Sequence, residues 1–223
     1  MIVRDGIRRM YTNQEKIFYY ITVYNENYQM PAVDNVDEVE QGVLRGMYRF
    51  AASSITDATA PRVNLFGSGS IMTQVLQARD QLEDRGIAVD VWSVTSYNEL
   101  HRDAMDCERW NRLHPDEAPR RPYVDQMLAE EKGVFVAASD YMKALPNCIA
   151  PWIPGRYSVL GTDGYGLSEA RDTLRDYFEV SPEHIVLAAI KALNDDGSNS
   201  TMASADLVRE LGIDASRANP ADA

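Results

Sequence analysis

Cysteine is scarce in this sequence. Among 223 residues only Cys107 and Cys148 occur, and they form no CxxC motif. Disulfide scaffolds and cysteine-rich zinc sites need more cysteines at closer spacing, so the sequence argues against both. No apolar run approaches the roughly 20 residues that a membrane-spanning helix needs, and the N-terminus MIVRDGIRRMY lacks the apolar core of a secretory signal. These absences predict a cytoplasmic protein.

Basic residues are also few. Lys and Arg number 22 against 34 Asp and Glu, which gives a net charge of -12 at pH 7. Nucleic acids and anionic membranes repel a chain of this charge. We therefore expect neither a nucleic-acid partner nor a membrane partner.

Hydrophobic residues make up 45% of the chain, enough for a sizeable core. Apolar patterning predicts strands at residues 44–51, 63–66, 89–94, 134–138 and 157–160. It predicts helices at residues 71–85, 97–111, 123–131, 143–150, 167–178, 182–193 and 204–211. Strands that alternate with helices require crossover connections, so the predicted fold is α/β with a mostly parallel sheet flanked by helices.

The N-terminal segment has a different pattern. Residues 2–10 resemble the end of a helix, and nothing like an N-cap precedes them. The continuous β-branched and aromatic run Ile17 to Val23 predicts a strand covered on both faces, for which the preceding residues supply no neighbour. An acidic stretch follows, which we interpret as a linker over residues 33–41. Residues 1–32 then belong to one domain and residues 42–223 to another.

The GSGS motif at Gly67 to Ser70 lies between a predicted strand and a predicted helix. Backbone amides at such a helix start can hold a phosphate. However, Thr73 and Gln74 stand where a dinucleotide-binding motif needs its last glycine, and no acidic residue closes the next strand. We therefore favour a tight strand-to-helix turn with Ser68 or Ser70 as the N-cap.

Several other candidates receive no catalytic role. Cys107 and His114 have the chemistry of a nucleophile and a base, but nothing in the local pattern supplies an orienting third group. His101 and His184 are predicted to lie on helices without a partner. The segment around Trp110 carries both charges. It is interpreted as a structural cluster of salt bridges, as part of a subunit contact, or as solvated surface.

The loop NENYQMP, Asn25 to Pro31, leaves the end of the predicted strand at residues 17–23, where ligand sites of parallel sheets gather. Glu26 has the chemistry of a proton carrier, and Asn25 and Gln29 have that of neutral hydrogen-bonding groups. An ordinary polar loop explains the same residues equally well.

Taken together, these segments resemble homodimeric-type pyruvate dehydrogenases (acetyl-transferring). The resemblance covers nearly the whole chain. It is carried, in this order, by YYITVYNENYQMPA, GVLRGMYRF, LFGSGSI, VDVWSVTSYNEL, RDAMDCERWNRLHP, SDYMKALP and VLGTDGYGLSEARDTLRDYFEV.

The resemblance implies a three-domain subunit of a homodimer, the decarboxylating first component of the pyruvate dehydrogenase complex. Thiamine diphosphate and Mg²⁺ would serve it, pyruvate would be its substrate, and the lipoyl group of dihydrolipoyl acetyltransferase would accept the two-carbon unit. Residues 1–32 would end the pyrimidine-binding middle domain, and residues 42–223 would form the transketolase-like C-terminal domain.

The resemblance also implies site residues. Asn25, Glu26 and Gln29 would belong to an active-site loop, although many relatives have His where this chain has Gln29, which cannot carry a proton near neutrality. Asp163 and Asn194 mimic the spacing of the magnesium ligands in a GDG motif, but Thr162 replaces the first glycine, so we reject that interpretation. No cofactor or metal ligand is assigned in this chain, and the chain alone is expected to be inactive.

Two other interpretations stay open. The chain is alternatively a non-catalytic α/β module for dimerisation or partner binding. Less favoured is a stand-alone nucleotide-binding α/β protein, which would use the Gly67 to Ser70 turn.

Overall fold

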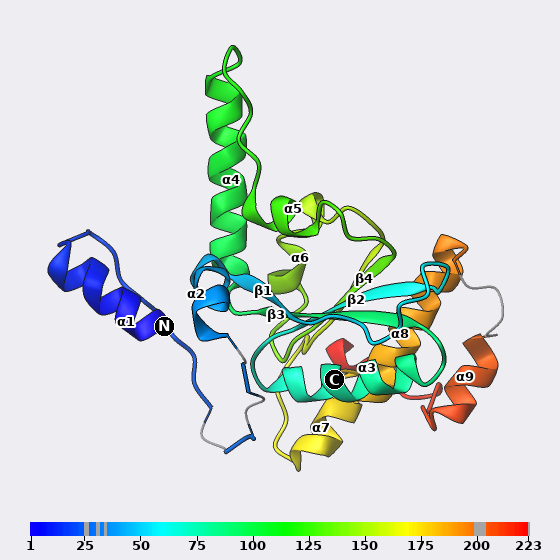
Figure 1. The fold of residues 1–223 in the computed structure, drawn as a ribbon. Helices are drawn as coiled ribbons and strands as arrows, with labels where there is room; N and C mark the ends of the chain where they lie inside the picture. The colour runs from blue at the N-terminus through cyan, green and yellow to red at the C-terminus, as the bar shows by residue number, and fades with distance from the viewer. Residues whose placement is uncertain (25–26, 30–31, 34, 199–203, 223) are drawn as a thin grey trace.

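The sheet at the centre of the fold has five strands. The computed structural model describes residues 1–24, 27–29, 32–33, 35–198 and 204–222. The strands are β1 (Met47–Ala51), β2 (Arg62–Gly67), β3 (Ala88–Val94), β4 (Val134–Ala138) and β5 (Tyr157–Leu160), in the order β1-β3-β2-β4-β5 (Figure 1). β1 pairs antiparallel with β3, and the other pairs are parallel. The predicted α/β fold with a mostly parallel sheet is confirmed.

Helices cover both faces of this sheet (Figure 1). The α-helices of the described residues are α1 (Ile2–Ile7), which lies apart from the sheet, α2 (Val36–Arg45), α3 (Met72–Glu83), α4 (Tyr97–Leu113), α5 (Tyr123–Leu128), α6 (Ala144–Asn147), α7 (Arg171–Tyr177), α8 (Pro182–Asp196) and α9 (Ser204–Glu210). A π-helical turn at Arg8–Thr12 continues α1, and 3-10 turns occupy Gly69–Ile71, Ala150–Trp152 and Pro220–Asp222.

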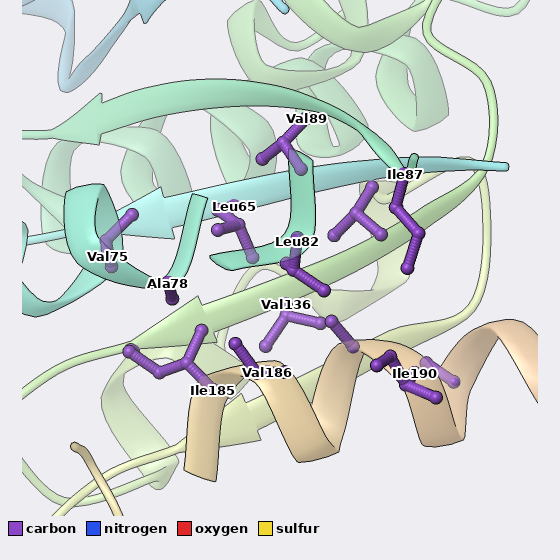
Figure 2. Close-up of a cluster of buried hydrophobic side chains, with 14 of the residues drawn as sticks. Leu65, Val75, Ala78, Leu82, Ile87, Val89, Val136, Ile185, Val186 and Ile190 are labelled. Atoms are coloured by element: carbon purple, nitrogen blue, oxygen red, sulfur yellow. The ribbon is translucent and has the colours of Figure 1, made fainter. Parts of the chain in front are cut away.

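One face of the sheet packs against α3 and α8. Leu65 of β2 and Val136 of β4 are fully or almost fully buried there against Leu82 of α3 and Ile190 of α8 (Figure 2). The apolar side chains of α3 recur at helical spacing, as the sequence predicted. Gly86 follows α3 with a φ of +77°, and the amide of Ile87 donates to the carbonyl of Leu82 at 3.1 Å. That geometry confirms the predicted glycine cap.

The other face carries the aromatic half of the core. Phe66, Trp92 and Phe135 alternate with the residues of the first face along their strands and pack against α4 and α5. The alternation arises because successive side chains of a strand point to opposite faces. Phe66 and Phe135 meet edge to face, with ring centroids 5.9 Å apart.

The predicted strand at Ile17 to Val23 is wrong. These residues belong to no helix or strand in the described structure, and Phe18, Tyr20 and Val23 are 86%, 86% and 85% exposed. A strand requires a neighbouring backbone for its amides and carbonyls, and none is provided here. The segment is instead tied to α1 through Tyr19, whose hydroxyl donates to Asp5 Oδ2 at 2.5 Å.

Element boundaries differ from the predictions at several points. α2 begins at Val36, within the predicted linker, and it includes Leu44, which was expected in the first strand. β1 therefore begins only at Met47. Three predicted helices are shorter in the structure, at α5, α6 and α7.

The predicted serine cap of α3 is also wrong. A 3-10 turn at Gly69–Ile71 precedes the helix, so Ser70 lies within that turn and Ile71 stands directly before α3, while Ser68 makes no side-chain capping bond. The Ser68 hydroxyl donates instead to Ser139 Oγ at 3.1 Å. A capping bond does occur at α4, where the amide of Glu99 donates to Ser96 Oγ at 3.2 Å.

Candidate functional site

The candidate site lies where the parallel strands end. β2 ends at Gly67 and β4 at Ala138, and the hydroxyls of Ser68 and Ser139 meet just beyond them, as described above. The amide of Tyr141 donates to Ser139 Oγ at 3.2 Å, which tightens the turn after β4. Ligand sites of parallel sheets gather at this carboxyl edge.

Tyr24, from the N-terminal segment, occupies the turn that follows β2. Gly69 has a φ of +54°, and a Cβ built on it would collide with the Tyr24 hydroxyl and ring. Only glycine combines that backbone conformation with so close a neighbour. A phosphate bound at the Gly67 to Ser70 turn would compete with this tyrosine, so the geometry favours the tight-turn interpretation.

The Tyr24 hydroxyl donates a hydrogen bond to Asp140 Oδ2 at 2.6 Å. Asp140 is the second residue after β4 and lies 116 positions away from Tyr24 in the sequence. Burial, reinforced by the hydrogen bond to Asp140, raises the pKa of Tyr24 well above its usual value. The phenol therefore stays protonated near neutral pH and acts as a donor.

Tyr28 forms a second contact with the C-terminal part of the chain. Its ring lies edge to face with Tyr24, with centroids 6.3 Å apart. Arg171 Nη1 and Arg175 Nη2, both on α7, donate to the Tyr28 hydroxyl at 2.9 Å and 3.2 Å. Both guanidinium groups also lie within 6 Å of the ring centroid, the range of a cation–π interaction.

Of the predicted loop residues, Gln29 is described and is exposed to solvent. Asn25 and Glu26 lie outside the described residues. No role was predicted from the sequence for Tyr24, Tyr28, Asp140 or the α7 arginines. Only Asp140 had a usable signal, because it stands at the carboxyl end of a predicted strand.

The rejected metal pair has other structural roles. The Lys143 amide donates to Asp163 Oδ1 at 2.9 Å, and Lys143 Nζ lies 3.6 Å from Asp163 Oδ2. Asn194 belongs to the last turn of α8. Within the part of the chain that the structure describes, no group of three or more His, Cys, Asp and Glu residues has the arrangement of a metal site.

Among the described residues, no hydrogen bond or ring contact joins Cys107 to His114. Cys107 is buried on α4, and burial raises the pKa of its thiol. The His114 ring stacks on Trp110 at 4.5 Å, and Arg120 covers Trp110 at 4.1 Å. The segment around Trp110 is thus a stacked cluster at the end of α4, which projects from the sheet (Figure 1).

The two remaining histidines also have structural surroundings. His101 meets Trp152 edge to face, with ring centroids 5.9 Å apart. His184 is buried on α8, and its Nδ1 lies 3.0 Å from Ser181 Oγ. Among the described helices, none is both long enough and apolar enough to span a membrane.

Comparison with known families gives two adjacent matches. Residues 1–31 match the family described as "Pyruvate dehydrogenase E1 component middle domain". Residues 46–181 match the family described as "Transketolase-like TK C-terminal domain". The second match covers more than half of the chain.

Curated relatives are similar to the chain over its whole length. The "Pyruvate dehydrogenase E1 component" of Pseudomonas aeruginosa is 44% identical, over 100% of this chain and 25% of that protein. The protein of the same description from Escherichia coli K12 is 42% identical, over 99% of this chain and 24% of its own length. The chain thus spans about a quarter of the length of the curated relatives it matches, at their C-terminal end. Among solved structures, "Transketolase from Leishmania mexicana" has a TM-score of 0.46 at 18% identity, over 74% of this chain and 21% of that chain.

Proposed function

Because the chain belongs to the family of transketolase-like C-terminal domains, we propose that it forms the C-terminal part of a thiamine-diphosphate-dependent pyruvate dehydrogenase E1 component. One observation carries the proposal. Similarity to curated E1 components runs without interruption from the middle-domain match through the C-terminal-domain match. The proposed domains are residues 1–32, the end of the middle domain, and 42–223, with 33–41 between them.

In the proposed enzyme, pyruvate is decarboxylated and the two-carbon unit passes to the lipoyl group of dihydrolipoyl acetyltransferase. Thiamine diphosphate, held with Mg²⁺, would supply the electron sink for this chemistry when bound. The described residues do not fit that group: Tyr24 fills the Gly67 to Ser70 turn, and the described side chains include no metal cluster. We therefore assign the cofactor's anchoring groups to polypeptide outside this chain.

The proposed work of this chain is to shape the subunit. We propose that its sheet and helices support the subunit and that Asn25, Glu26 and Gln29 belong to an active-site loop. We further propose that the assembled enzyme is a cytoplasmic homodimer. The acidic charge of the chain is consistent with protein partners rather than nucleic acid.

The proposal is tested by combining the chain with the remaining region of a curated relative. The 223-residue chain is co-expressed with the region of the Escherichia coli relative that precedes the matched quarter, and pyruvate-dependent reduction of ferricyanide is measured. We expect turnover from the combination and none from either polypeptide alone. If the two folded polypeptides, each checked by circular dichroism, fail to associate, the proposal is wrong.

Calorimetry gives a second test on the chain by itself. Titration with thiamine diphosphate and Mg²⁺ is expected to show no saturable binding in the micromolar range. A thermal-shift screen with nucleotides is expected to show no stabilisation, whereas a clear shift would favour a nucleotide-binding protein.

A further inference from the structure

Two tyrosines join the N-terminal segment to the carboxyl edge of the sheet at separate points. Tyr24 contacts the turn after β2 and Asp140 after β4, whereas Tyr28 contacts α7. We propose that Tyr24 and Tyr28 are positioning residues that form a two-point latch, through which the C-terminal domain holds Gln29 in place. The latch itself is a property of this chain, and only its importance for turnover rests on the proposed function.

The first point of the latch is specific in both shape and chemistry. The 2.6 Å hydrogen bond to Asp140 needs a hydroxyl donor at position 24. The Tyr24 ring lies so close to residue 69 that only glycine, which has no side chain, fits there. Tyr24 lies between Gly69 and Asp140, which follow two neighbouring parallel strands. Because those strands are rigidly paired, the position of Tyr24 is set by the sheet.

The second point fixes the direction in which the chain continues. The Tyr28 hydroxyl accepts from both arginines of α7, and the side chain of Arg175 is only 12% exposed. Arg175 also pairs with Asp172 at 3.3 Å on the same helix. Since Gln29 is the next residue after Tyr28, the α7 arginines determine where its backbone begins.

The same contacts hold both tyrosine hydroxyls in place. The Tyr24 hydroxyl already donates to a carboxylate, and the Tyr28 hydroxyl accepts from two guanidinium groups. Hydrogen bonds to charged groups are the stronger ones in proteins, so both hydroxyls are well held. Their role is to hold Gln29, and with a domain boundary at residues 33–41 the two tyrosines would form a contact between domains.

The first experiment examines the latch in the 223-residue chain. Tyrosines are nitrated with tetranitromethane at pH 8, and each site is quantified by mass spectrometry, with the 75% exposed Tyr11 as the internal control. Because nitration proceeds through the phenolate, we expect Tyr24 to react at least about tenfold more slowly than Tyr11.

Substitutions of the acceptor then test the hydrogen bond. Asp140→Ala should raise the nitration rate of Tyr24 and leave Tyr11 unchanged, whereas Asp140→Asn keeps an acceptor oxygen and should preserve the protection. Equal reactivity of Tyr24 and Tyr11 in the wild-type chain, or no effect of Asp140→Ala, would overturn the latch.

The second experiment measures turnover in the recombined enzyme described above. Tyr24→Phe keeps the ring and removes the donor, and we expect kcat to fall on the order of tenfold with little change in KM. Asp140→Ala should match it, Asp140→Asn should restore kcat, and the double variant Tyr24→Phe with Asp140→Ala should be no worse than either single change. Tyr20→Phe is the control, because Tyr20 is 86% exposed.

The two experiments separate the two proposals. If the recombined enzyme shows no turnover at all, the proposed function fails while the nitration result still decides the latch. If wild-type turnover is present and Tyr24→Phe leaves kcat unchanged, the positioning role is wrong even if the hydrogen bond exists.

Discussion

Trp92 donates its indole N–H to Asn64 Oδ1 at 3.0 Å, inside the sheet between β2 and β3. Asn64 is completely buried, and its Nδ2 donates to the carbonyl of Lys132 at 2.9 Å. This side chain thus satisfies the indole N–H of Trp92, which would otherwise be buried without a partner, and also binds the Lys132 carbonyl. Trp92 is the largest fully buried side chain, so the asparagine serves the aromatic half of the core.

We therefore expect Asn64→Ala to destabilise the fold. The substitution leaves the buried Trp92 N–H without its partner, at a cost of about 1–3 kcal/mol in the free energy of unfolding. Denaturation in urea, followed by tryptophan fluorescence, measures the difference. Asn98→Ala, at an exposed position of α4, is the matched control, and equal effects of the two changes would contradict this role of Asn64.

The aliphatic half of the core gives a second prediction. Leu82 is fully buried between α3 and the sheet, so Leu82→Ala should lower the free energy of unfolding by about 2–5 kcal/mol. Leu113→Ala removes the same atoms from a side chain that is 54% exposed and should cost far less. The same denaturation experiment serves both variants. If Leu113→Ala lowered the free energy of unfolding as much as Leu82→Ala, the assignment of Leu82 to the core would be wrong.

Most of the domain could be predicted from periodicity, and the reasons are visible in particular elements. β2, β3 and β4 are apolar runs closed by glycine or hydroxyl residues, and they are buried on both faces as a central parallel strand must be. The same signal failed at Ile17 to Val23. The composition of a segment indicates that it can form a strand. Whether another strand lies beside it depends on the rest of the polypeptide.

The candidate site was harder to predict because its contacts are long-range. Tyr24 and Asp140 are 116 residues apart, and nothing local to either residue indicates the other. Gln29 was identified from its loop and from family resemblance, whereas the residues beside it were missed. A strand-end position such as that of Asp140 is a usable signal, but the tyrosine that it binds can be found only from the fold.

His184 should make stability depend on pH. Burial lowers the pKa of its imidazole below the ordinary value of 6.5, against the opposing effect of Asp176. The unfolded chain then takes up a proton at higher pH than the folded chain does. Stability contributed by the neutral ring is therefore present above about pH 6.5 and declines as the pH falls through the lower folded-state pKa.

The variant His184→Gln removes this group. Its free energy of unfolding should change less than that of the wild type between pH 7.5 and pH 5, measured by denaturation at each pH. Asn98→Ala, which changes no titratable group, should run parallel to the wild type. Parallel profiles for His184→Gln as well would show that the histidine is not the source.

Gly69 and Gly86 form a matched pair for measuring the contact with Tyr24. Both have positive φ, +54° and +77°, but a Cβ on Gly86 would meet nothing within 4 Å. Gly86→Ala should therefore cost only the backbone strain, about 1–2 kcal/mol. Gly69→Ala should cost more, because the methyl group also displaces Tyr24. Adding Tyr24→Ala should reduce the extra cost, and an unchanged cost in that background would mean that the two residues do not touch.

The exposed apolar side chains of the N-terminal segment predict self-association of the chain. Phe18 and Val23 are more than four-fifths exposed, and the segment that carries them has no strand partner in the described structure. Such surfaces bind one another in water because association removes apolar area from solvent. Light scattering should show oligomers of the 223-residue chain that increase with concentration, and the double variant Phe18→Ser with Val23→Ser should shift them toward the monomer. Leu113→Ser, on the projecting α4, is the control and should leave the distribution unchanged. A wild-type chain that stays monomeric at high concentration would show that its net charge of -12 outweighs the apolar surface.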